Sequence, residues 1–240
     1  MKKQQFYILM AFFFYLLNWF IAQLVSGYIG SLIFVALYSS LSGVFIPLFL
    51  MVKFKIKYKN EKKHLMIIGV IYLITFTALN VIGSDALSHT INSKPSVEVI
   101  IKYLILFIPM SFGLTVFCLY LIPGMILDMA KSKTFGYITA PIFSGIAMGF
   151  AFFVDTLGSI EMLLIMGVMG IFYSVGFILT RSLYLNWLFF CITMLFHTLG
   201  EAKYYHYKWS ILIIQIISIV VFGIIFILIK NKLLYKTKTI

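Results

Sequence analysis

Long apolar segments separated by short polar connections make up almost the whole chain. A hydrocarbon core about 30 Å thick needs roughly 20 apolar residues per helix, and lipid offers the backbone no partner outside its own helix. The pattern therefore predicts an all-α, polytopic integral membrane bundle of about eight transmembrane helices. The expected segments are 6–25, 31–52, 65–82, 103–127, 135–154, 160–179, 183–199 and 209–229.

The polar connections are too short to hold a separate soluble domain. The longest of them are 53–64 and 83–102. The first and second segments are separated only by 26–30, and the sixth and seventh only by 180–182. We therefore expect a single membrane domain over 1–240, with tight helical hairpins at the short connections.

Composition and charge agree with a membrane protein. Hydrophobic residues make up 62% of the chain and charged residues 11%, too few polar groups to cover a soluble globule. The net charge is +12, but with a cytoplasmic N-terminus most basic residues fall in connections on the cytoplasmic side, as the positive-inside rule requires. We predict a multi-pass protein of the cell membrane with both termini cytoplasmic, membrane lipids as partners and no nucleic-acid partner. The basic residues left on the outer side are Lys94, Lys102, Lys203 and Lys208.

Motifs of soluble enzymes are absent from the sequence. It contains no GxxxxGK[ST], HExxH, GxSxG or CxxC pattern, so it has none of the short phosphate, zinc or nucleophile signatures. We therefore expect no cofactor, no metal site and no nucleotide-hydrolysing activity within this chain.

The candidate chemistry lies at the end of the seventh segment. His197 and Glu201 are four residues apart, which places both on one helical face, where a carboxylate can orient an imidazole. Ionisable groups inside a membrane span are costly and usually face the protein interior. The alternative is a polar cap at the outer end of the helix.

The surroundings of these two residues resemble a known family. Spaced glycines in 167–176 precede a polar turn at 180–182, Ser182-Leu183-Tyr184 opens the next helix, and His197 follows. This order resembles the C-terminal signature of the CPBP proteins (CAAX-protease and bacteriocin-processing, or Abi), which are glutamic-type intramembrane proteases and relatives. The resemblance implies that His197 is the family's histidine and that Glu201 stands where the family usually has Asn or Asp.

A second motif is matched in position but not in chemistry. Ile122-Pro123-Gly124 resembles the place of the family's EExxxR motif and the glycine that follows it. In that register Cys118 and Leu119 stand at the paired glutamates and Pro123 at the arginine. The resemblance covers about 100–201, and it implies a CPBP-like core over that range.

The departures from the family pattern argue against a standard glutamic protease. No Glu lies between Glu98 and Glu161 and no His between His89 and His197, so both the paired glutamates and the FxxxH motif are missing. In the family a glutamate is expected to activate water as a general base, a role that Cys118 cannot take over directly. A degenerate intramembrane protease remains one alternative.

The preferred hypothesis is acyl transfer to lipid-modified proteins, because the family also resembles components of lipoprotein N-acylation. A lipidated protein or peptide is then the substrate, with or without a second membrane-associated protein as partner. His197 with Glu201 would act as the base, and Cys118 would approach His197 across the bundle unless it is an inert core thiol. Two further hypotheses stay open: a non-enzymatic bacteriocin-immunity or partner-binding protein, and the permease subunit of a peptide-exporting ABC transporter.

Overall fold

The computed structural model describes residues 3–25, 27–58, 62–84, 86–155, 158–198 and 208–236. Within these ranges all the regular secondary structure is helical, without a strand. The elements are α1 (Lys3–Leu24), α2 (Gly27–Leu32), η1 (Ile33–Phe45), α3 (Ile46–Lys53), α4 (Lys63–Gly83), α5 (Ala86–Ser93), α6 (Val97–Val116), η2 (Phe117–Leu121), α7 (Ile122–Met129), α8 (Lys133–Asp155), α9 (Ile160–Thr180), α10 (Leu183–Thr198) and α11 (Trp209–Lys236).

The prediction of an all-α polytopic bundle is confirmed, with seven helices in the described ranges long and apolar enough to cross a membrane. The seventh expected segment differs, because α10 has only 16 residues. At 1.5 Å per residue it is about 24 Å long, which is less than a typical span. The seven candidate spans are Lys3–Leu24, Gly27–Lys53, Lys63–Gly83, Val97–Met129, Lys133–Val154, Ile160–Thr180 and Trp209–Lys230.

Two spans contain a π-helical segment just before a proline. Pro47 and Pro123 lie in the first turn of α3 and α7, directly after η1 and η2. Proline has no N–H to donate and its ring displaces the carbonyl one turn earlier, so the α-helical pattern cannot run through it unchanged. In η1 the hydroxyls of Ser40 and Ser42 donate to the carbonyls of Val35 and Leu37, five residues earlier. Serine side chains thus supply donors where the backbone pattern is altered.

The span formed by α6, η2 and α7 is the centre of the bundle. In its apolar window 83% of the residues are buried inside the protein, against 17% for the window of α11. Glycines permit close contact of its backbone with a neighbouring helix: a side chain at Gly113 would come within 2.7 Å of the Cα of Gly43 on η1. The central span therefore positions the helices around it, including α10.

The predicted hairpin between the sixth and seventh segments is present. Helix α9 ends at Thr180 and α10 begins at Leu183. Between them Arg181 adopts a left-handed conformation with φ of 53°. The side chain of Asn186 reaches back into the turn, donating to Thr180 Oγ1 at 3.1 Å and to the carbonyl of Ser182 at 2.8 Å.

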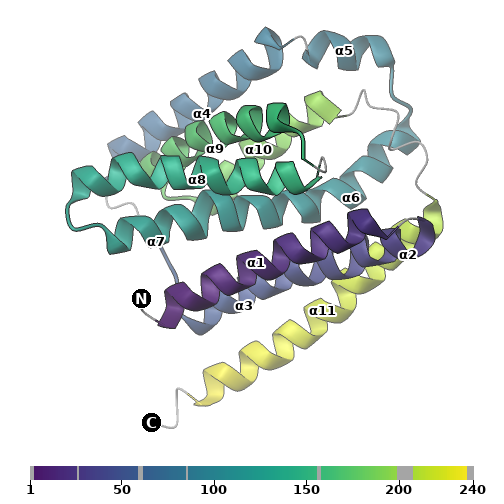
Figure 1. Ribbon diagram of the computed structural model, residues 1–240, viewed down its shortest axis with the longest axis horizontal. Helices are drawn as coiled ribbons and strands as arrows, with labels where there is room; N and C mark the ends of the chain where they lie inside the picture. The colour runs from purple at the N-terminus through teal and green to yellow at the C-terminus, as the bar shows by residue number, and fades with distance from the viewer. Residues whose placement is uncertain are drawn as a thin grey trace.

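Helix α1 begins and α11 ends at the same end of the bundle, together with the connections α3–α4, α7–α8 and α9–α10 (Figure 1). We call this the basic end, and the other, which carries α5 and the start of α6, the α5 end. The basic residues near the α5 end are Lys94, Lys102 and Lys208. Those at the basic end are Lys3, Lys53, Lys55, Lys57, Lys62, Lys63, Lys131, Lys133, Arg181 and Lys230.

The cytoplasmic location of the basic end remains a prediction from charge, and single cysteines at Lys57 and Ser88 test it. Both side chains are exposed, at opposite ends of the bundle. In a chain whose Cys118 and Cys191 are replaced by alanine, a membrane-impermeant thiol reagent added to intact cells should label Ser88→Cys. It should label Lys57→Cys only after the cells are opened. Labelling of both in intact cells would contradict the proposed orientation.

Candidate functional site

His197 lies near the C-terminus of α10, at the α5 end of the bundle. Its Nε2 is 2.7 Å from Oδ1 of Asn80 and 3.4 Å from Oγ of Ser84. An amide Oδ1 only accepts hydrogen bonds, so Nε2 carries the proton in the shorter contact. In this arrangement Nε2 of His197 donates a hydrogen bond and does not act as a base.

Further contacts make this region a polar clasp between helices, defined by Asn80, Ser84, Thr90 and His197. Thr90 Oγ1 on α5 donates to the carbonyl of Phe196 at 2.7 Å. Asn80 also donates from Nδ2 to the sulfur of a methionine on α9 at 3.0 Å. The polar clasp therefore joins α4, α5, α9 and α10. This geometry agrees with the alternative in which His197 is a polar cap at the end of its helix.

Glu201, the predicted carboxylate partner of His197, lies outside the described residues. The pairing of His197 with Glu201 thus stays a prediction.

The structure does not bring Cys118 to His197. Cys118 is fully buried on η2, and its carbonyl accepts a hydrogen bond from Ser144 on α8. Ser111 on α6 contacts Cys191 on α10 at 3.0 Å, which gives a common level for these two antiparallel helices. Cys118 lies seven residues beyond that level towards the basic end, and His197 six residues beyond it towards the α5 end. At 1.5 Å per residue they are separated by about 20 Å along the bundle.

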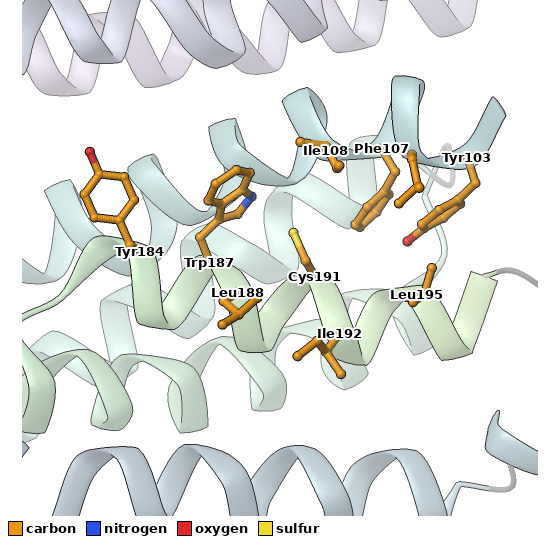
Figure 2. Close-up of a pocket in the computed structure, with 10 residues that line it drawn as sticks. Tyr103, Phe107, Ile108, Tyr184, Trp187, Leu188, Cys191, Ile192 and Leu195 are labelled. Carbon is orange, nitrogen blue, oxygen red and sulfur yellow. The ribbon is translucent and has the colours of Figure 1, made fainter. Parts of the chain in front are cut away.

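An apolar groove between α6 and α10 is the feature that sequence reasoning missed. Its volume is about 310 Å³, and in Figure 2 Tyr103 and Phe107 on α6 lie on the side towards α10, with Cys191 of α10 directed towards α6. The available signal was periodicity, since the lining residues of each helix recur three or four positions apart and so form one face. They are Tyr103, Leu104, Phe107, Ile108, Tyr184, Trp187, Leu188, Cys191, Ile192 and Leu195.

Ser111 links the polar atoms of Trp187 and Cys191 at the border of this groove. Its Oγ donates to the carbonyl of Ile108 at 3.0 Å and accepts from Nε1 of Trp187 at 3.1 Å. Because a hydroxyl has a single hydrogen, the contact of Ser111 with the sulfur of Cys191 at 3.0 Å requires the thiol to donate. Figure 2 shows that sulfur directed towards α6. The thiol is therefore held protonated, whereas the nucleophilic form of cysteine is the thiolate.

His197 and the groove lie on different faces of α10. Cys191 faces α6, and His197 is six residues further along, which is about 120° around the helix axis. Accordingly, His197 contacts α4 through Asn80 and is absent from the groove lining. The polar clasp and the groove are thus two separate features of one helix.

The segment that resembles the EExxxR position packs under the α3–α4 connection. Any side chain at Gly124 would overlap the ring of Tyr58, so glycine is needed for this close approach. The backbone N–H of Tyr58 donates to the hydroxyl of Tyr120 at 3.4 Å. The ring of Tyr58 packs against that of Phe177, with their centroids 5.7 Å apart. Burial, followed by the negative charge of Asp128, raises the pKa of the Tyr58 hydroxyl. The Tyr58 hydroxyl therefore stays neutral, and its ring covers Gly124 at the basic end of the bundle.

No protein-family model, no curated protein and no solved structure matches this chain. The fold and the site define a polytopic α-helical membrane protein with a groove between two helices. The resemblance to the CPBP proteins is carried by the sequence pattern in 100–201, and membership of that family stays a prediction.

If the contact between His197 and Asn80 is structural, its two partners should be coupled in stability. His197→Ala and Asn80→Ala should each lower the free energy of unfolding by about 1 kcal/mol, the usual net contribution of such a hydrogen bond. The double variant should lose little more than either single one. Denaturant unfolding of the purified protein in detergent measures all three. Fully additive losses would show that the two side chains do not interact.

Tyr58 provides a second test, because its buried hydroxyl has no hydrogen-bond partner in the described part of the chain. Tyr58→Phe should leave stability unchanged or raise it by up to about 1 kcal/mol, since it removes an unsatisfied polar group. Tyr58→Ala should lose about 3 kcal/mol of aromatic packing, the lower end of the range for buried rings, because Tyr58 is partly exposed. Thermal unfolding in detergent compares them. A Tyr58→Phe variant as unstable as Tyr58→Ala would show that the hydroxyl is needed.

Proposed function

We propose that this chain takes part in acyl transfer to lipid-modified proteins and that it does so by holding an acyl chain in the groove between α6 and α10. The observation that carries the proposal is the groove itself. It is lined by aliphatic and aromatic side chains, its volume of about 310 Å³ is within the usual range of ligand pockets, and it lies on a helix pair of a membrane bundle.

The physical basis of such binding is shape and packing. An acyl chain in the bilayer is already in an apolar environment, so the hydrophobic effect gives no advantage for entering the groove. Close van der Waals contact with rigid rings favours entry into the groove, because each well-placed atom pair adds a small attraction. Stacked Tyr103 and Phe107, with ring centroids 4.8 Å apart, provide one such rigid wall.

The polar contacts beside the groove give it an orientation. Ser111, Cys191 and Trp187 form a hydrogen-bonded group on one border of an otherwise apolar lining. The hydrogens of these three groups are used within the protein, so the group marks the more polar border of the groove, and an acyl chain would extend along the helices beside it. Tyr184, whose side chain is 70% exposed, stands at the basic end of the lining (Figure 2).

The chemistry of transfer requires a base that the groove lining does not contain. Among its residues no carboxylate, imidazole or lysine occurs, and the Cys191 thiol donates its hydrogen bond. The proposal therefore assigns lipid binding to this chain. It assigns proton transfer to the segment containing Glu201 or to a second membrane-associated protein. The same observation favours the second candidate, a non-enzymatic partner-binding or immunity protein that uses the groove for docking alone.

The test is the acyl state of a model lipoprotein in cells that lack the native chain. Mass spectrometry of its N-terminal peptide should show acylation restored by the wild-type chain. Ile108→Trp places an indole in the groove and should reduce acylation by about tenfold or more, equivalent to 1.4 kcal/mol. Ile101→Trp is the matched control, because Ile101 lies two turns away on the same face of α6 with similar exposure, outside the groove lining.

Three results decide between the candidates. No change of acylation with the wild-type chain overturns the acyl-transfer proposal and leaves partner binding. Equal losses in Ile108→Trp and Ile101→Trp overturn the assignment to the groove. In the same assay Glu201→Gln should abolish activity if the base lies in this chain, whereas Cys118→Ser should have no effect.

A further inference from the structure

A second groove lies on a different face of the bundle, between α1, α7 and α8. Its volume is about 470 Å³, and no polar side chain contributes to it. The lining residues of α8 follow one helical face, three or four positions apart. The full lining is Leu9, Phe12, Leu16, Ile122, Met125, Ile126, Met129, Phe143, Ile146, Ala147 and Phe150.

This groove continues into a cavity of about 610 Å³ at the turn between α7 and α8. The two share Ile126, Met129 and Phe143, so they are neighbouring hollows on the outer surface of the bundle, which together we call the depression. The character of the wall changes along it, from wholly apolar to partly polar. The second cavity adds Ala130, Lys131, Ser132, Phe135 and Thr139.

The polar part of the depression is cationic. Lys131 and the neighbouring Lys133 are exposed at the basic end, beside the start of α8. Ser132 Oγ accepts from the N–H of Phe135 and so caps this helix. The nearby carboxylate of Asp128 is absent from the lining, and its charge acts on Tyr58. The mouth therefore offers positive charge above an apolar channel.

We propose that this depression binds an anionic phospholipid, with its phosphate at Lys131 and its acyl chains along α1, α7 and α8. A positive mouth over an apolar channel complements a lipid with a negative headgroup. The lining of α8 extends 17 residues beyond Lys133, to Phe150, or about 25 Å by the helical rise. Since one leaflet is about half of a 30 Å core, the channel is deep enough for the chains of that leaflet.

A transmembrane helix of a partner protein fits this surface less well. Such a helix would fill the apolar channel, but at the mouth it would have to provide its own acidic group for Lys131. An anionic lipid places its negative charge at the level of the basic end, because its headgroup lies at the membrane surface. The site is separate from the α6–α10 groove, so this proposal does not rest on acyl transfer.

Native mass spectrometry of the whole purified chain tests the proposal with two probes, phosphatidylglycerol and phosphatidylcholine of identical acyl chains. The wild type should retain phosphatidylglycerol in preference. Lys131→Gln should reduce that retention by about fivefold, the factor for one lysine near an anionic surface, and leave phosphatidylcholine unchanged. Ile146→Trp should reduce retention of both lipids by blocking the channel.

The controls carry the same substitutions outside the depression. Lys94→Gln removes a lysine at the α5 end, and Ile142→Trp adds an indole one turn from Ile146, at a position that lines neither cavity. Both should bind phosphatidylglycerol as the wild type does. If Ile146→Trp fails to fold, the Lys131→Gln variant still tests the proposal, because Lys131 is exposed and its replacement should not disturb folding.

Three outcomes would overturn the proposal. The first is equal retention of the two lipids by the wild type, and the second is an equal effect of Lys131→Gln and Lys94→Gln. The third is displacement of phosphatidylglycerol by millimolar inorganic phosphate, which would show that the mouth takes a free anion. Failure of the lipoprotein assay described above leaves this binding measurement unaffected.

Discussion

The structure depends first on the need to satisfy every backbone polar group inside the bilayer. Water is absent there, so each N–H and carbonyl needs a partner within the protein. Continuous helices meet this requirement over most of the chain. Where Pro47 and Pro123 interrupt it, π-helical segments change the hydrogen-bonding pattern, and in the first of them Ser40 and Ser42 donate to carbonyls. Of these two spans, the one with η2 is mostly interior, with 83% of its apolar window buried, against 39% for the one with η1.

The same constraint explains where the polar side chains are. Gln215 on α11 donates to Ser39 and Ser40 on η1, the hydroxyls of Tyr15 and Tyr38 meet at 2.7 Å, and the polar clasp holds α10 against α4. Each group joins two different spans or helices, because a polar atom facing lipid is expensive. The interior polar groups thus serve packing, and the two grooves are apolar surfaces on the outside of the bundle.

The candidate site was only partly predictable. Sequence singled out His197 as a polar group on the seventh apolar segment, whereas the face of α10 on which it lies depends on its partner Asn80, 117 positions earlier. The case for Cys118 rests on its place in a motif, and the antiparallel course of α6 and α10 keeps it apart from His197. The α6–α10 groove has a periodic signal, yet periodicity cannot separate a groove wall from an ordinary packed face.

What the sequence by itself determined is local: helical segments from apolar length, hairpins from short connections, and the grouping of basic residues that share one end of the bundle. These follow from properties carried by consecutive residues, namely hydrophobicity, proline geometry and charge. Tertiary structure alone decided that Tyr58 covers Gly124, that Ser111 contacts both Trp187 and Cys191, and that two neighbouring cavities share Ile126, Met129 and Phe143. Each of these needs the rotation and depth of one helix relative to another, and close packing of side chains distant in sequence sets both.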